Sequence, residues 1–317
     1  MFNQKWTRML LVMAMVAMVL VGCAAPADTP EQEAVVVEDS LYPLTIVDGF
    51  EREVMITEEP MKIVSLAPSV TETLFAIGAG DKLVGRTDYD TYPEAVNEIT
   101  SVGSLSDPSI EAIVELAPDL VIASTHFKEE VLEKLEEVDI PVVVLIEQES
   151  FEGTYELIRK AGKITNTEDE ANQVVAGMEG LVADVLDRVK DRTPVSVYYV
   201  VGFGEYGDFT ATGETYISGM LEMAGGVNIA KDATGWSYSI EKVVEQKPEV
   251  LLCSAYFGAK DGIMAANGYK DLDAVKNGKL IEVDNNMIDR QGPRLGLGLL
   301  ELAKAMHPDA FEGFEVK

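Results

Sequence analysis

Residues 109–124 read SIEAIVELAPDLVIAS, and 130 positions later residues 239–254 read SIEKVVEQKPEVLLCS. Seven of the 16 aligned positions are identical, and most of the others keep their polarity. In each copy a helical pattern leads to a proline and an acid, and then to a short apolar run that is typical of a buried strand. A segment repeated at this distance indicates two related structural units, one in each half of the chain.

Each copy is preceded by residues that favour the start of a helix. Asp107 and Pro108 stand before the first copy, and Ser237 stands before the second. Asp and Ser are preferred N-cap residues, and proline is preferred in the first helical turn. We therefore expect Asp107 and Ser237 to cap the two helices.

Short apolar runs alternate with helical patterns on both sides of the repeat. This alternation, with strands that are apolar on both faces, is typical of an α/β fold with parallel sheets. The sequence therefore predicts two Rossmann-like lobes, an N-lobe (62–166) and a C-lobe (193–317), with a ligand cleft between them. The expected strands are residues 63–66, 83–85, 120–123, 142–146, 195–201, 250–253 and 280–283.

The segment between the lobes predicts one long helix. Apolar residues recur at steps of three and four from Val174 to Val189, and Pro194 follows before the next strand. At 1.5 Å per residue, a helix over residues 168–191 spans roughly 36 Å. We expect a rigid helix within 167–192 to bridge the lobes.

Two capping boxes and one hairpin are also predicted. Thr167 with Glu170, and Ser69 with Glu72, have the spacing at which each residue bonds the backbone of the other at a helix start. Two short apolar runs around the pair Asp48-Gly49 predict a β-hairpin within residues 41–61.

The first 22 residues have the pattern of a signal peptide. Two basic residues precede an uncharged run, 9–21, that is shorter than the roughly 20 residues a membrane-spanning helix needs. Gly22-Cys23-Ala24-Ala25 completes a lipobox, which predicts lipidation at Cys23. Residues 23–40 are then a lipidated cysteine and a disordered spacer. The expected location is the extracytoplasmic face of the cell membrane, held through the lipid anchor only.

Charge and cysteine content narrow the classes of function. The chain has 25 basic and 55 acidic residues, and removing residues 1–22 takes the net charge from −30 to −32. A chain this acidic is excluded as a nucleic-acid-binding protein. With Cys23 acylated, Cys253 is the only thiol left, so the core must hold the fold without a disulfide.

Several motifs together resemble the solute-binding proteins for cobalamin and ferric siderophores. They are KIVSLAPS at 62–69 followed by Thr71-Glu72, VGRTDY at 84–89 followed by Tyr92-Pro93, the two repeats, and GPR at 292–294. The similarity runs from about Lys62 to Pro308. It implies two α/β lobes bridged by one stiff helix, and a monomer without cofactor or catalytic step. Such a protein carries a metal chelate (siderophore, corrinoid or haem) to an ABC permease and its ATPase.

The resemblance also implies a role for Glu111 and Glu241, which occupy the same place in the two repeats. In the family an exposed glutamate on each lobe docks onto arginines of the permease. Two carboxylates on opposed lobes would give fast, salt-sensitive docking to a basic partner. The structural alternative is an acid that stabilises the first turn of a helix. For Glu72, the capping box alone accounts for the residue.

Ligand contacts are expected in the loops that follow strands, where aromatic side chains supply contact area for a large flat chelate. Arg290 and Arg294 flank Gly292-Pro293, and Arg290 is expected to meet a carboxylate or phosphate of the ligand. For Arg294 a salt bridge within the chain is the favoured interpretation. The remaining candidates are Arg86, Asp88, Tyr89, Tyr92, Thr125, His126, Phe127, Phe203, Tyr206, Trp236, Tyr238, Tyr256 and Phe257.

Other classes of site are less consistent with the sequence. Residues 202–207 spell G-x-G-x-x-G, but no helix pattern follows, which favours a loop over the cleft to a dinucleotide site. His126 and His307 are the only histidines, too few for a bare transition-metal site, although His126 could meet a chelated metal. A secreted hydrolase or other enzyme on a two-lobed scaffold remains the alternative, without any recognised catalytic motif.

The identity of the chelate stays open at this point. The segment 89–93 resembles corrinoid-binding relatives, whereas Ser104-Leu105 stands where such relatives often place an aromatic residue. The predicted hairpin is commoner among binders of iron chelates.

Overall fold

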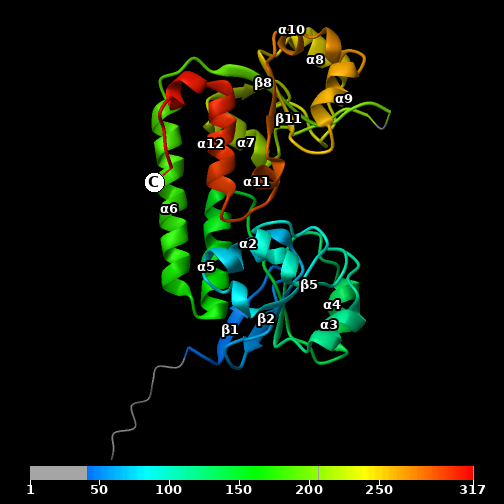
Figure 1. The fold of residues 1–317 in the computed structure, drawn as a ribbon, viewed down its shortest axis with the longest axis vertical. Helices are drawn as coiled ribbons and strands as arrows, with labels where there is room; N and C mark the ends of the chain where they lie inside the picture. Colours follow the sequence, from blue (N-terminus) through cyan, green and yellow to red (C-terminus); the bar gives the residue numbers. More distant parts are fainter. Residues whose placement is uncertain (1–40, 206, 317) are drawn as a thin grey trace, which may run out of the picture. The chain divides into compact units, whose positions relative to one another are not determined.

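The computed structural model describes residues 41–205 and 207–316 (Figure 1). The predicted signal peptide, Cys23 and the spacer lie outside the described residues. Within the described part, no helix has both the length and the apolar character needed to cross a bilayer.

The N-lobe is built on a parallel five-stranded sheet in the order β5-β4-β3-β6-β7. All residues of β3, β6 and β7 are buried, as expected for strands covered on both faces. The strands are β3 (Ile63–Ser65), β4 (Leu83–Arg86), β5 (Thr100–Ser101), β6 (Leu120–Ala123) and β7 (Val142–Val144). The helices are α2 (Pro68–Ala76), α3 (Ile110–Leu116), α4 (Glu129–Glu136) and α5 (Phe151–Thr165), with 3₁₀ turns η1 (Gly80–Lys82) and η2 (Glu94–Glu98).

The C-lobe repeats this plan with the order β10-β8-β11-β12, also parallel, and a short β9 antiparallel to β8. Its strands are β8 (Val195–Gly202), β9 (Phe209–Thr210), β10 (Gly226–Asn228), β11 (Val250–Ser254) and β12 (Leu280–Val283). Its helices are α7 (Tyr216–Met223), α8 (Ile240–Gln246), α9 (Ala259–Ala265), α10 (Asp273–Lys276), α11 (Asn285–Asp289) and α12 (Leu295–Met306), with turns η3 (Tyr269–Asp271) and η4 (Pro308–Phe311). The predicted two-lobed α/β fold is confirmed.

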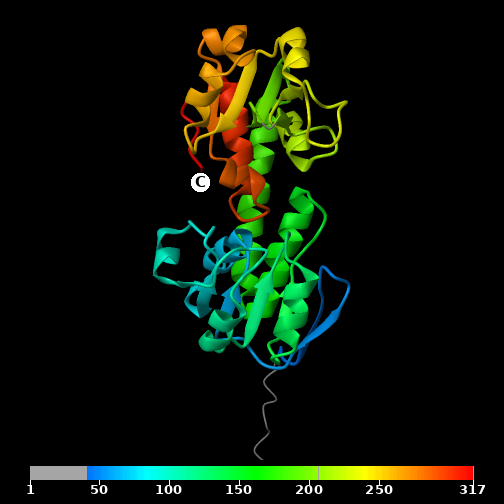
Figure 2. The same cartoon turned by 90° about the vertical axis from the view of Figure 1, so that its right-hand side faces the viewer.

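The predicted long helix is α6 (Glu168–Val189), which runs alongside both lobes (Figures 1 and 2). It packs against α5 of the N-lobe and α12 of the C-lobe. Its buried side chains, from Ala171 to Val189, belong to one hydrophobic cluster that reaches from Leu44 in the N-lobe to Phe311 in the C-lobe. The two lobes therefore share a continuous core along this helix.

The repeat is reproduced residue by residue. Helices α3 and α8 begin and end 130 positions apart, and each stops at a residue in the left-handed conformation, Ala117 (φ 46°) and Lys247 (φ 50°). The acid that follows each proline ties down the neighbouring strand: Asp119 accepts backbone N–H bonds from Met61 and Lys62, and Glu249 accepts one from Ser196. The repeated acid therefore has a structural role in both lobes.

Two predicted N-caps and two predicted capping boxes are wrong. The N-caps of α3 and α8 are Ser109 and Ser239, inside the repeat, rather than Asp107 and Ser237. Thr167 stands at the N-cap of α6 but its side chain makes no cap bond, because its hydroxyl group lies 2.9 Å from that of Thr165. In α2 the N-cap is Ala67, so Ser69 lies inside the helix and does not cap it.

The predicted hairpin consists of β1 (Leu44–Val47) and β2 (Glu53–Ile56), paired antiparallel. Its connection is longer than the expected two-residue turn. Asp48 is buried and organises the loop by accepting bonds from the backbone N–H groups of Phe50 and Arg52 and from the Arg52 guanidinium. The hairpin is thereby fixed to the N-lobe, where Gly49 donates a backbone bond to Val144.

Candidate functional site

A cleft of about 860 Å³ lies between the carboxyl ends of the strands of the two lobes. In α/β proteins this edge of the sheet is where ligands bind, because loops meet there without filling the space. From the N-lobe the wall is formed by residues that follow the five strands of the sheet: Ala67, Pro68, Ser69, Tyr89, Leu105, Ser124, Thr125, His126 and Glu149. From the C-lobe it is formed by Val201, Glu214, Thr215, Tyr216, Ile217, Trp236, Asn286, Asp289, Arg290 and Gln291.

Two ring-bearing residues of the wall hold an uncommon backbone conformation. His126 has φ 70° and Trp236 has φ 61°, in the left-handed region that non-glycine residues rarely adopt. Both side chains are exposed to the cleft, and Tyr89 is 53% exposed beside them.

Five of the predicted ligand residues line the cleft. They come from both lobes, and most of them lie in loops that follow strands. They are Tyr89, Thr125, His126, Trp236 and Arg290.

Three predicted aromatic residues lie in the cores instead. Phe127 is 7% exposed and stacks on Phe50 within the N-lobe core. Phe203 packs edge-on against Tyr269. Tyr238 is 8% exposed and belongs to the C-lobe core. Aromatic residues after strands also fill cores, and periodicity alone cannot separate the two roles.

The other predicted ligand residues lie outside the cleft wall. The Arg86 guanidinium donates to the carbonyls of Val96 and Thr87, and the Asp88 carboxylate accepts from Ser101, so both brace their own loop. Three aromatic residues are exposed but do not line the wall: Tyr92, Tyr256 and Phe257. The Tyr92 ring lies 4.2 Å from the Arg294 guanidinium, and the Tyr256 hydroxyl donates to Asp284. Tyr206 is outside the described residues. Residues 202–207 were expected to form a loop over the cleft. Within the described part of this segment the only aromatic residue is Phe203, and it packs against the C-lobe core.

Glu72 has a role that its predicted capping box did not suggest. Its carboxylate is 1% exposed and accepts three bonds of 2.8 Å, one from Arg290 and two from Arg294. Glu72 belongs to α2 of the N-lobe, whereas both arginines belong to the C-lobe, in the turn before α12. The predicted salt bridge of Arg294 is present, and Arg290 is held by the same carboxylate.

We call Glu72, Arg290, Arg294 and Asp284 the ionic cluster. Asp284 lies 3.5 Å from Arg294, so the four side chains carry two positive and two negative charges. The carboxylates raise the pKa of Arg294 above its usual value, against the opposing effect of burial. The cluster joins the lobes at a second place besides α6, and it is electrically balanced.

Two polar contacts continue this junction. Arg290 donates to the backbone carbonyl of Tyr89, and Gln291 donates to that of Gln148, at 3.2 Å each. Figure 1 shows the turn between α11 and α12 reaching α2 at the boundary between the lobes. A small relative motion of the lobes would have to break these bonds as well as shear the core along α6.

Three carboxylates line the cleft without an ion-pair partner. In the described part of the chain, Glu149, Glu214 and Asp289 form no salt bridge with a lysine or arginine. Glu214 accepts a backbone bond from Gly235, which lowers the pKa of its carboxyl group. Desolvation raises the pKa of the Asp289 carboxyl group, partly offset by a bond from Asn285. The cleft therefore has an acidic wall that the sequence analysis did not identify, although Asp289 adjoins the predicted Arg290.

Glu111 and Glu241 lie in the first turns of α3 and α8, and both are exposed. Bonds from its own backbone N–H and from Ser239 lower the pKa of Glu241, so this residue also stabilises its helix start. Figure 1 shows both helices on the side of the protein opposite α6.

In the described part, no group of three or more His, Cys, Asp or Glu residues is placed to hold a metal ion.

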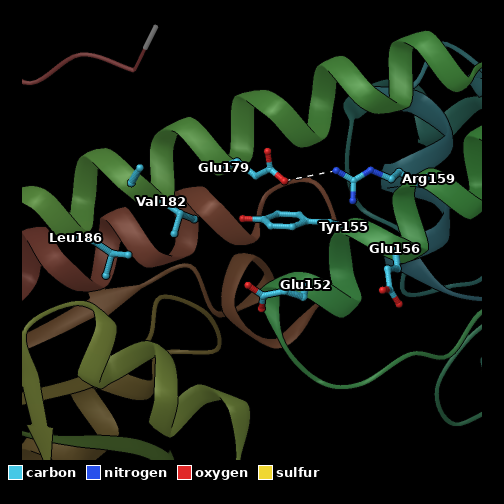
Figure 3. A pocket seen from close by; sticks show the side chains of 8 residues that line it. Glu152, Tyr155, Glu156, Arg159, Glu179, Val182 and Leu186 are labelled. Carbon is cyan, nitrogen blue, oxygen red and sulfur yellow. Dashed lines mark hydrogen bonds and ion pairs between the residues drawn. The ribbon is translucent and has the colours of Figure 1, made fainter.

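A second hollow, of about 380 Å³, lies between α5 and α6 (Figure 3). Its wall includes Glu152, Glu156 and the ion pair between Arg159 and Glu179, which are 3.4 Å apart. This pair is about half exposed, in contrast to the ionic cluster. The hollow is formed by neighbouring helix surfaces and receives no loop from either sheet.

The chain is similar to known transport proteins over nearly its whole length. An uncharacterized ABC transporter substrate-binding lipoprotein of Bacillus subtilis, YvrC, is 32% identical over 313 residues, 97% of this chain and 98% of its own. A cobalamin-binding protein of Halobacterium salinarum is 28% identical over 97% of this chain and 86% of its own. The apo structure of the heme-binding protein RhuT from Roseiflexus sp. RS-1 is 27% identical, with a TM-score of 0.71 over 78% of this chain and 98% of that one.

The family comparison decides between the two classes of function that the sequence left open. Residues 63–287 match the family described as periplasmic binding protein, which is a family of transport proteins and not of enzymes. The enzyme alternative is therefore not supported. The chain belongs to the periplasmic binding protein family, and it is a substrate-binding protein that serves an ABC transporter.

Proposed function

We propose that this protein captures a metal chelate in the cleft between its lobes and delivers it to the permease of an ABC importer. The observation that carries the proposal is the cleft of about 860 Å³, which is lined by Tyr89, Tyr216 and Trp236 together with His126. Aromatic walls of this kind suit a large flat ligand, because they supply contact area at little cost in side-chain entropy. The relatives named for cobalamin and heme binding support the same class of ligand.

Cys23 is proposed as the lipid attachment site, with residues 24–40 as the tether on the extracytoplasmic face of the membrane. The lipobox supports this, and so does the name of the Bacillus subtilis relative as a lipoprotein. The tether would keep the protein close to its permease. Replacing Cys23 should therefore lower uptake while leaving the ligand affinity of the purified protein unchanged.

Ligand capture can be tested with the fluorescence of Trp236, the only tryptophan left after removal of residues 1–22. Cobalamin, haem and ferric siderophores are titrated separately into the mature protein. Saturable quenching by at least one of them, confirmed by calorimetry, is expected. If none of them binds, the proposed class of ligand is wrong.

Docking is proposed to use Glu111 and Glu241, because they lie exposed in matched first turns of α3 and α8. Glu111→Lys and Glu241→Lys should each reduce uptake at equal ligand affinity, and should weaken the salt dependence of permease binding. The control is Glu115→Lys with Glu245→Lys, one turn further along the same helices and equally exposed. If the control variants impair uptake as strongly, the first-turn glutamates are not the docking residues.

A further inference from the structure

The charges around the cleft do not match an anionic ligand. Glu149, Glu214 and Asp289 line the wall, and none of them is ion-paired with a basic residue in the described part of the chain. Arg290 is the one lysine or arginine among the described wall residues. Arg290 already forms an ion pair with Glu72 at 2.8 Å, and the four residues of the ionic cluster together carry no net charge.

From this arrangement we propose that the cleft selects its chelate by charge, taking neutral or cationic chelates and rejecting anionic ones. This inference rests on the proposed function and narrows it. A chelate whose outer edge carries uncharged amide groups, or one with a net positive charge, matches the charge of the cleft. Haem with two free propionates, or a ferric tris-catecholate, would bring negative charge against three carboxylates with no free guanidinium to receive it.

Three further observations point the same way. Desolvation raises the pKa of the Asp289 carboxyl group, so a positive group of the ligand would stabilise its ionised form. The whole chain, with 55 acidic against 25 basic residues, adds a field that repels anions before they reach the cleft. Amide groups from Asn286 and Gln291, in the same wall, can bond an uncharged polar rim.

The test uses ligands that differ in charge within one chelate class. For corrinoids these are diaquocobinamide (cationic), cyanocobalamin (neutral) and a cyanocobalamin monocarboxylic acid (anionic). For iron chelates they are ferrioxamine B (cationic) and ferric enterobactin (anionic). Affinities of the mature protein are measured by calorimetry at low and at high salt. Within each class that binds, we expect about a tenfold loss of affinity for each added negative charge at low salt, or ~1.4 kcal/mol, and a smaller loss at high salt.

In the triple variant Glu149→Gln/Glu214→Gln/Asp289→Asn, the ratio of the affinities for the cationic and the anionic chelate should be at least tenfold smaller than in the parent protein. The matched control is Glu58→Gln/Asp81→Asn/Glu137→Gln. It also removes three exposed acids, but from the opposite, amino-terminal edge of the N-lobe sheet, and none of the three forms a salt bridge in the described residues. The control should leave the difference unchanged.

The possible outcomes separate the two proposals. If the anionic member binds as tightly as the cationic one, or if the cleft variant changes nothing, the charge selection is wrong while the capture of a chelate stands. If the control variant narrows the difference as much as the cleft variant does, overall charge and not the cleft wall makes the selection, and the proposal is wrong. If no member of either class or haem binds, the proposed function itself fails.

Discussion

Replacing Glu72 by glutamine should weaken the junction between the lobes strongly, although the two side chains have nearly the same shape. The carboxylate accepts three bonds of 2.8 Å from two guanidinium groups and is 1% exposed. Glutamine keeps the shape, but only its oxygen can accept, and its NH₂ group would face a guanidinium donor. Among the described residues, Arg294 would keep Asp284, at 3.5 Å, as its ion-pair partner, and Arg290 would lose the one carboxylate that it binds directly.

The expected cost is about 3 kcal/mol in the free energy of unfolding. Breaking a buried ion pair by removing one partner costs about 3–5 kcal/mol, because the other charge stays buried. The two arginines are 16% and 13% exposed, so water can partly replace the lost carboxylate, which places the cost at the lower end. With a urea m-value of about 3 kcal/mol/M, the midpoint of unfolding should fall by about 1 M.

Urea titration followed by circular dichroism measures this midpoint, and hydrogen exchange locates the effect. Exchange should speed up in α2 and in residues 290–294, the two segments that Glu72 joins. The control is Glu179→Gln, whose pair with Arg159 is about half exposed at 3.4 Å and should contribute less than about 1 kcal/mol. If the midpoint falls no further for Glu72→Gln than for Glu179→Gln, the ionic cluster does not hold the lobes together.

Three further changes test other parts of the structure. Asp48→Asn should destabilise the protein at pH 7, and its difference from the parent should close as the pH falls below about 4 in urea titrations. The reason is that the Arg52 and backbone bonds outweigh burial and lower the pKa of Asp48, so its contribution is present above the unfolded pKa and is lost on acidification. Trp236→Ala should lower ligand affinity and leave thermal stability unchanged. Phe203→Ala should lower thermal stability and leave ligand affinity unchanged. Titration and scanning calorimetry of each variant measure both quantities, and the reverse pattern would contradict the assignment of the two residues. Ser109→Ala should cost about 1 kcal/mol in urea titrations, since its side chain accepts from the Ala112 N–H, and Ser239→Ala should cost less because it makes no cap bond; equal costs would refute the distinction.

The fold was accessible from the sequence because its signals are local and periodic. Apolar runs marked the long strands, and the steps of three and four marked α6. Strands β5, β9 and β10 were missed because they are two or three residues long and owe their pairing to neighbours. Helix starts were misplaced by one turn or less, since several Ser, Thr and Asp residues near each start could cap and only the folded backbone decides among them.

The cleft was predictable in position but only partly in its residues. Loops after strands had to converge, which located Tyr89, His126 and Trp236. Whether an aromatic residue such as Phe127 turns inward depends on the backbone angles of the turn, which sequence spacing does not contain. Glu72 was misread because its partners stand 218 and 222 positions away, and a local capping motif gave a sufficient explanation.

The shared core along α6 affects how ligand-free and ligand-bound protein would compete for the permease. Because the two lobes are joined there and at the ionic cluster, we expect α3 and α8 to keep nearly the same separation when a ligand binds. If the permease grips these two helices, it cannot tell the two forms apart by that distance. Empty protein would then compete with loaded protein for the same permease, so raising the amount of binding protein above that of its ligand should slow uptake.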